Sequence, residues 1–398
     1  MAKVLVVWGH WGPYHYARYR IFREMGASQG ITVEGLELFG GSEVYAWKTD
    51  TEPPGMHRLD LGSNELAFRP WRLASQALPL ILKIKPDVCF VPAYWHWSLF
   101  VNAAARAAGA RIVMMNDTHA GTARARNLKY LVKRQIVRSF HSALVAGSPQ
   151  RRYFSDLGLA PYRIFTGYDV VDNNYFAAAA AAVREDAQHY RRKYALPERY
   201  FLNLGRFVDK KNLTVLVEAF ALSLKFAAPD SVHHLVFVGD GTSESDIRKA
   251  CENFGVPVVD HDTETDSSVV SPTDKGAVHF YGFKQLAESP VFYALATAFV
   301  LPSIYDEWGL VVNEAMACSL PVLVSEGAGC AEDLVLQGVN GFRFNPHDID
   351  ALAQLLKLLA ADGDLAKTMG AASGKRIREW GCERFASGGI AAVREALN

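Results

Sequence analysis

Short apolar, β-branched runs alternate along the chain with longer segments of helical periodicity. In the first half the strand-like runs span 3–9, 86–93, 111–117, 142–148 and 162–169. In the second half they span 200–205, 234–241, 278–283, 297–303, 321–327 and 341–345. Continuous apolar strands separated by helices are typical of parallel sheets that helices cover on both faces. The pattern predicts two parallel α/β units in tandem, and residues 39–69 stay unassigned.

The two halves meet in a segment rich in alanine and charge. Six successive alanines, residues 177–182, favour helix, and Pro197 interrupts it. We therefore predict an acceptor-side N-terminal domain over residues 1–175 and a C-terminal domain over 176–378. We expect the last helix, residues 379–398, to return to the first domain.

Composition narrows the class of protein. A chain of 398 residues is too long for one core and suits two domains. Lys+Arg and Asp+Glu both number 42, so the basic excess of a nucleic-acid-binding protein is missing. The apolar runs fall short of the ~20 residues that span a bilayer, and no signal-peptide pattern opens the chain, so we expect a cytoplasmic protein. The five cysteines lack zinc spacing and are predicted to be free thiols.

The most informative stretch is LPSIYDEWGLVVNEAMACSLPVLVSEGAG, residues 301–329. In open parallel sheets, ligands bind beyond the carboxyl ends of strands, and Asp306 lies in such a loop. Gly309 then opens a helix, whose first amides lack intrahelical partners and favour a phosphate. Glu314 lies four residues beyond Leu310 on the same helical face, where a carboxylate can accept hydrogen bonds from sugar hydroxyls.

This stretch resembles the retaining GT-B glycosyltransferases of family four. The matching positions are Ser303, Asp306, Trp308, Gly309, Glu314, Ala315, Met316, Ala317, Pro321 and Val322. Three positions depart from the pattern: Asp306 replaces a Glu, and Glu307 and Ser319 each replace a Gly. The resemblance implies a GT-B fold, two Rossmann-like parallel-sheet domains facing an interdomain cleft.

A second motif, LGRFVDKKNLTVLVEAF, spans residues 204–220. Arg206 follows a strand, and Lys211 comes five residues later. Two cations that converge on one group can neutralise a departing diphosphate without a metal. The resemblance assigns the diphosphate to Arg206 and Lys211, with Lys210 as the neighbouring alternative. We therefore expect neither a metal nor a cofactor, since the nucleotide-sugar is a substrate.

The resemblance also implies roles for other residues. Glu314 would bind the ribose hydroxyls, whereas Asp306 and His119 would orient the transferred sugar. A strand end that is rich in glycine lets a ligand approach the backbone, and the segment 281–284 would lie against the base. The further donor-binding residues implied are Gly239, Phe283, Gly309 and Leu310.

The acceptor side is assigned to the first domain. His119 stands in NDTHAG, after a strand, and Gly12 stands where the family has a Gly-rich loop. Aromatic rings offer flat faces to sugar C–H surfaces. Candidates of this kind, with one neighbouring His, follow two strands: Trp11, Tyr14, Trp95 and His96. Core packing is an equal interpretation for each aromatic residue.

Residues 123–140 form a basic amphipathic segment. Leu131, Val132 and Ile136 recur at helical spacing among several Lys and Arg side chains. Such a helix suits either packing on its own sheet or peripheral contact with an anionic membrane at the inner face. Both interpretations stay open.

Together these features predict a metal-independent glycosyltransferase. The donor would be a nucleotide-sugar, with UDP or GDP expected, and the acceptor a glycan, a lipid-linked or a small molecule. Retention of anomeric configuration follows from the resemblance alone. The alternatives are a nucleotide-sugar epimerase and a non-catalytic nucleotide-sugar-binding protein.

Overall fold

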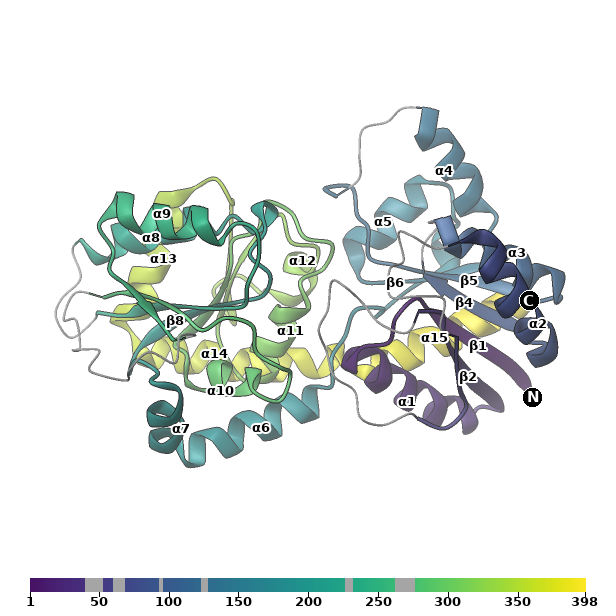
Figure 1. Ribbon diagram of the computed structural model, residues 1–398, viewed down its shortest axis with the longest axis horizontal. Helices are drawn as coiled ribbons and strands as arrows, with labels where there is room; N and C mark the ends of the chain where they lie inside the picture. The colour runs from purple at the N-terminus through teal and green to yellow at the C-terminus, as the bar shows by residue number, and fades with distance from the viewer. Residues whose placement is uncertain (40–52, 60–68, 93–95, 123–127, 226–231, 262–275) are drawn as a thin grey trace. The chain divides into compact units, whose positions relative to one another are not determined.

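The computed structural model describes residues 1–39, 53–59, 69–92, 96–122, 128–225, 232–261 and 276–398. These residues form two compact units (Figure 1). Unit 1 comprises residues 1–172 and 380–398, and unit 2 comprises residues 173–379. Each unit contains one seven-stranded sheet, and every strand pair in it is parallel. The prediction of two Rossmann-like α/β domains is confirmed.

Unit 1 orders its strands β3-β2-β1-β4-β5-β6-β7. The strands are β1 (Ala2–Trp8), β2 (Ile31–Glu37), β3 (Met56–Arg58), β4 (Val88–Pro92), β5 (Arg111–Asn116), β6 (Ser142–Val145) and β7 (Ile164–Thr166). The helices are α1 (Pro13–Ala27), α2 (Pro70–Ile84), α3 (His96–Ala107), α4 (Leu128–Arg138), α5 (Ser148–Asp156) and α15 (Cys382–Leu397). The direction of strand addition reverses between β1 and β4, and open parallel sheets bind ligands at such a point.

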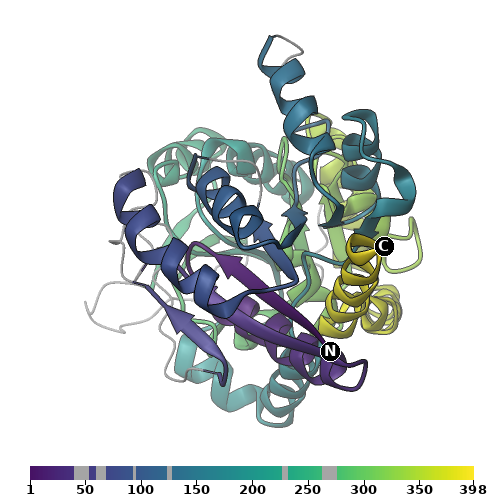
Figure 2. The same cartoon turned by 90° about the vertical axis from the view of Figure 1, so that its right-hand side faces the viewer.

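Alternation along β1 builds two cores in unit 1. Leu5 and Val7 pack with α2, α3, α4 and α5 on one face of the sheet. Val4 and Val6 pack with α1 and α15 on the other face. Because the C-terminal helix α15 lies against this sheet, both chain ends belong to unit 1, where Figures 1 and 2 show them near each other.

Unit 2 orders its strands β10-β11-β9-β8-β12-β13-β14, with the reversal between β8 and β12. The strands are β8 (Tyr200–Leu204), β9 (His234–Val238), β10 (Val258–Asp260), β11 (Val278–Phe280), β12 (Ala298–Leu301), β13 (Val322–Ser325) and β14 (Gly341–Phe344). The helices are α6 (Asn173–Glu185), α7 (Ala187–Tyr194), α8 (Leu213–Leu224), α9 (Glu244–Phe254), α10 (Ser289–Leu295), α11 (Leu310–Ala317), α12 (Ala331–Leu334), α13 (Ile349–Ala361) and α14 (Gly363–Ile377).

Three strands were not predicted. β2 reads ITVEGLE, in which polar residues interrupt the apolar ones, so it differs from the continuous runs of the central strands. β3 and β10 have three residues each and lie at sheet edges. Edge strands need less apolar sequence because a neighbour covers only one side. The five cysteines are buried free thiols, as predicted.

Candidate functional site

Two lysines and two carboxylates meet at the reversal point of unit 2. Lys210 and Lys211 end a short 3₁₀ turn after β8, whereas Asp306 and Glu307 follow β12. The Lys211 Nζ donates to Asp306 Oδ2, and Lys210 Nζ lies 2.6 Å from Glu307 Oε2 and 3.7 Å from Asp306 Oδ1. The backbone joins the two segments as well, since Ile304 N–H donates to the Lys210 carbonyl at 2.8 Å. Strand ends that are ~100 residues apart in sequence thus form one charged site.

The electrostatics of this site fix its charge states. Asp306 is 7% exposed. Burial raises the pKa of its carboxyl, but Lys211 and Lys210 outweigh burial, so the pKa lies below its usual range. Burial lowers the pKa of Lys210, but Glu307 and Asp306 reverse this and hold it above the usual range. Asp306 and Lys210 therefore stay ionised at neutral pH, where a lysine ammonium group can attract a phosphate.

Arg206, which is predicted to bind the diphosphate together with Lys211, is exposed and follows β8 directly. The adjacent Phe207 N–H donates to the Asp240 carbonyl at 2.7 Å, which ties this loop to the end of β9. Arg206 thus lies at the same sheet edge as Lys211.

Helix α11 carries Glu314, the residue that is predicted to bind the ribose hydroxyls. Gly309 precedes it with φ of 100°, and a Cβ there would come within 2.9 Å of Leu301 Cδ2. Glycine is therefore required for the turn that leads into Leu310. Glu314 is 2% exposed, and its Oε2 accepts a hydrogen bond of 3.0 Å from the Tyr293 hydroxyl. Sequence reasoning missed Tyr293, which lies in the apolar helix α10 without a polar pattern around it.

Glycines bring the ends of β8, β9 and β11 into close contact. Gly239 has φ of 135°, and a Cβ there would lie 2.0 Å from the Gly205 carbonyl oxygen. Its N–H donates to the Gly282 carbonyl at 2.7 Å. Phe283, the predicted base-side residue, follows and is 39% exposed. Only glycine permits this approach, and it leaves backbone rather than side chain lining the strand ends.

Three histidines form a hydrogen-bonded chain beside this segment. His261 Nε2 lies 3.0 Å from His279 Nδ1, and His279 Nε2 lies 2.9 Å from His234 Nδ1. His261 also stacks on Tyr281 at 4.1 Å between ring centroids. Burial lowers the pKa of all three rings, that of His279 to about 3. The chain is neutral at pH 7 and links β10, β11 and β9 side by side.

In unit 1, His119 lies just beyond β5 and is buried. Its Nδ1 accepts a hydrogen bond of 3.2 Å from the Gly121 N–H. The neutral ring then carries its proton on Nε2, where it can donate. A Cβ at position 121 would come within 2.9 Å of the His119 ring, so Gly121 is needed for this ring position.

The loop after β1 is held by a carboxylate that sequence reasoning missed. Glu37 accepts from the Trp11 N–H at 2.9 Å and from Arg58 Nε at 2.6 Å. Burial raises the pKa of Glu37, but hydrogen bonds from His10, Trp11 and Arg58 outweigh it and lower the pKa. Gly12 caps α1, and its N–H donates to His15 Nδ1 at 3.0 Å. A single Glu at the end of an alternating strand gives little sequence signal.

The residues that were predicted to bind the acceptor differ in burial and in placement. Trp11 is only 1% exposed, donates from Nε1 to the Leu36 carbonyl, and packs on Trp8 and Tyr19. It is a core residue, so the structure corrects the prediction that its ring faces a sugar. Tyr14 lies half-buried in the first turn of α1. Trp95 lies outside the described residues, and His96 is placed only as the first residue of α3.

Comparison with known proteins supports the motif interpretation. The sequence model of the family Glycosyl transferases group 1 matches residues 198–362. Sulfoquinovosyl transferase SQD2 of Arabidopsis thaliana is 25% identical over 389 residues, which cover 91% of this chain and 66% of that protein. The family match includes both motifs, residues 204–220 and 301–329. The chain spans just under two thirds of the length of the Arabidopsis relative.

Similarity to solved structures shows that the chain has the GT-B fold. A glycosyltransferase from Rickettsia africae superposes with a TM-score of 0.73 at 14% identity and covers 100% of this chain and 99% of its own. Anabaena HepE in complex with UDP-glucose gives 0.67 at 17% identity, over 97% of this chain and 98% of its own. Identities this low establish the fold alone.

Among the described residues, no group of three or more His, Cys, Asp or Glu side chains could hold a metal ion. Within the same part of the chain, no helix combines the length and apolar character needed to cross a bilayer.

Proposed function

We propose that the chain is a glycosyltransferase, which transfers a sugar from a nucleotide-sugar donor to a hydroxyl-bearing acceptor. The observation that carries the proposal is the convergence of Lys210 and Lys211 on Asp306 and Glu307 at the reversal point of the unit 2 sheet. This is the position where open α/β sheets bind nucleotides. The match to the family Glycosyl transferases group 1 covers residues 198–362, most of this unit.

In the proposed mechanism, Arg206 and Lys211 bind the diphosphate and stabilise the charge that develops as it leaves. Preorganised cations are effective here because they need no rearrangement during the reaction. The Lys211 ammonium is already fixed by its buried ion pair with Asp306. Glu314, oriented by Tyr293, binds the ribose hydroxyls.

Unit 1 supplies the acceptor side in this proposal. His119, with its proton on Nε2, donates a hydrogen bond to the transferred sugar, and the loop held by Glu37 contributes Gly12 and Tyr14 to acceptor binding. No carboxylate is assigned as a covalent nucleophile. Retention of configuration remains a prediction from the family resemblance.

Transfer is favoured over epimerisation because the plant relative is a transferase and the Anabaena structure was solved with UDP-glucose. A UDP-sugar is the proposed donor on the same ground, and GDP-sugars are the competing class. The acceptor class stays open among glycans, lipid-linked and small molecules.

The proposal includes a peripheral membrane contact by α4. Val137 packs into the core of unit 1 and Ile136 lies against it, whereas Leu131 and Val132 are 55% and 56% exposed. Packing on the sheet therefore accounts for only part of the apolar stripe. Exposed apolar side chains among Lys133, Arg134 and Arg138 suit an anionic lipid surface.

A thermal-shift panel of UDP-, GDP-, ADP- and dTDP-sugars tests the donor. A bound ligand raises the melting temperature by mass action. We expect UDP-glucose or a related UDP-sugar to raise it and expect Arg206→Ala to abolish the rise. If none of the four nucleotide classes raises the melting temperature, the proposal is wrong. Donor incubated without acceptor should yield no epimerised sugar.

A further inference from the structure

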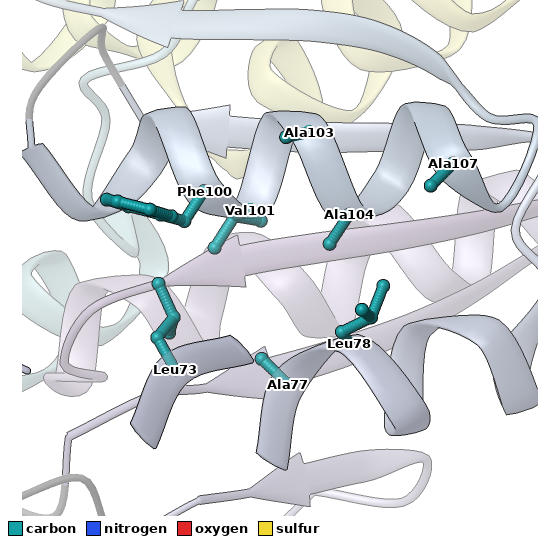
Figure 3. A pocket seen from close by; sticks show the side chains of 8 residues that line it. All are labelled: Leu73, Ala77, Leu78, Phe100, Val101, Ala103, Ala104 and Ala107. Carbon is teal, nitrogen blue, oxygen red and sulfur yellow. The ribbon is translucent and has the colours of Figure 1, made fainter. Parts of the chain in front are cut away.

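An apolar groove lies between α2 and α3 in unit 1. Its volume is about 290 Å3, close to the lower end of small-molecule pockets, which start at roughly 300 Å3. Figure 3 shows the lining side chains between the two helices, with Leu73, Ala77 and Leu78 from α2 and Phe100, Val101 and Ala104 from α3. All eight lining residues are apolar. The groove therefore suits a hydrocarbon ligand, because no lining side chain can satisfy a polar group.

Large apolar side chains are exposed at the start of both helices. Trp71, in the first turn of α2, is 60% exposed, and Leu99 and Phe100, in the first turns of α3, are both 42% exposed. Isolated exposed apolar residues are ordinary, but a cluster beside an apolar groove marks an interaction surface.

The same region carries a strong positive charge. Residues 66–155 contain fourteen Lys and Arg but only two acids, Asp87 and Asp117, in a chain of zero net charge. Helices α2, α3 and α4 contain no Asp or Glu at all. The rest of the chain is correspondingly acidic, so the charge is segregated and not merely abundant.

Several of these basic residues lie on the outside of this layer. α2, α3, α4 and α5 pack their apolar sides on one face of the unit 1 sheet, which directs their polar sides outward. Arg72, Lys83, Arg106 and Arg138 are all exposed. An apolar groove within a basic layer is complementary to a molecule that has a hydrocarbon chain and a negative head.

We propose that the α2–α3 groove binds one acyl chain of an anionic phospholipid while the surrounding basic layer contacts the headgroups of the same bilayer. A single acyl chain gives only marginal membrane binding, and stable binding needs a second signal such as a polybasic patch. This region of unit 1 offers both. The inference extends the α4 membrane contact proposed above to a defined lipid site, and it does not depend on sugar transfer.

Vesicle co-sedimentation of the full chain tests the charge requirement. The probes are vesicles of phosphatidylcholine alone and of phosphatidylcholine with phosphatidylglycerol. We expect binding only to the anionic vesicles, with at least tenfold weaker binding when salt is raised from 0.1 to 1 M, because screening shortens the range of surface charge to about 3 Å. Equal binding to both vesicle types, or none to either, overturns the proposal, as does binding of a soluble polyanion such as heparin without vesicle binding.

Two variants separate the groove from the general surface. Ala104→Trp fills the groove but adds an aromatic side chain and no charge, so acyl-chain entry predicts at least fivefold weaker vesicle binding. A merely adsorbed surface predicts unchanged or stronger binding, which would refute the groove as a lipid site. Phe100→Asp should weaken binding at least tenfold, whereas Phe254→Asp on α9, at a matched 44% exposure, should not.

Two further measurements distinguish a misfolded variant from a loss of lipid binding, and the groove from the α4 contact. UDP-sugar thermal shift should be retained in Ala104→Trp, which shows that the variant is folded and that the donor site is separate. Arg134→Glu combined with Arg138→Glu tests the α4 contact alone. If that pair abolishes binding while Ala104→Trp leaves it intact, the α4 contact stands and the groove proposal falls.

Discussion

The loops at the carboxyl ends of the two sheets make different kinds of polar contact. In unit 2, two lysines and two carboxylates converge, and Lys211 and Asp306 are fixed in a largely buried pair. In unit 1, a main-chain N–H holds His119, Trp11 is part of the core, and the ion pair of Glu37 with Arg58 holds the loop after β1. A leaving diphosphate needs fixed positive charge, whereas an acceptor hydroxyl needs orientation. The comparison teaches that one architecture can supply both needs through the loops that follow its strands.

Removing a cation from unit 2 should have the largest effect. Arg206→Ala or Lys211→Ala is expected to lower turnover about 100-fold or more, as the loss of one preorganised contact to developing charge does in other enzymes. Steady-state kinetics with the UDP-sugar identified by thermal shift gives the measurement. Lys367→Ala, an exposed lysine of the same unit, is the matched control. Near-normal turnover in both site variants would remove their assigned role.

His119→Ala tests the role proposed for unit 1 in orienting the transferred sugar. A lost hydrogen bond from one positioning side chain is expected to lower turnover about 10- to 100-fold. The dissociation constant of UDP should stay unchanged, because His119 is not assigned to the nucleotide. Weakened UDP binding with normal turnover would reverse that assignment.

Glu314→Gln probes the ribose contact in unit 2. Exchanging a charged acceptor for a neutral one should weaken UDP binding about tenfold. Isothermal calorimetry measures it directly. Tyr293→Phe, which removes the hydroxyl that orients Glu314, should have a smaller effect in the same direction. Unchanged affinity in the Glu314 variant would show that the ribose lies elsewhere.

The histidine chain is expected to affect stability and not turnover. His279 has a folded pKa of about 3 against an ordinary value of 6.5, so between these values the unfolded state binds a proton that the folded state does not. Stability should therefore fall as pH falls from 6.5 toward 3, by at most about 1.4 kcal/mol per pH unit for this group. The free energy of unfolding, measured with urea at several pH values in that range, should depend less steeply on pH in His279→Gln. The exposed His347→Gln should leave the slope unchanged; identical slopes in all three proteins would contradict the account.

The sequence predicted unit 2 better than unit 1 for a physical reason. The central strands of both sheets are buried on both faces and read as continuous apolar runs, which is why they were found. The charged loops of unit 2 lie within two compact motifs, so Asp306, Arg206 and Lys211 could be named in advance. The ion pair between Lys211 and Asp306 could not be predicted, because it joins two loops that are distant in sequence.

The contacts of unit 1 carry weaker signals. Glu37 holds the loop after β1 but belongs to no recognisable motif, and the aromatic Trp11 suits a core as well as a sugar-binding face. Periodicity cannot separate those two roles, because both need a flat apolar ring. Only the tertiary packing decided that Trp11 is buried.

A crystal structure of the chain with a bound UDP-sugar tests the central claim most directly. The account predicts that the diphosphate lies within about 4 Å of Arg206 and Lys211, at the carboxyl ends of β8 and β12, with the ribose hydroxyls at Glu314. A diphosphate bound away from both cations, with its ribose distant from Glu314, would contradict it.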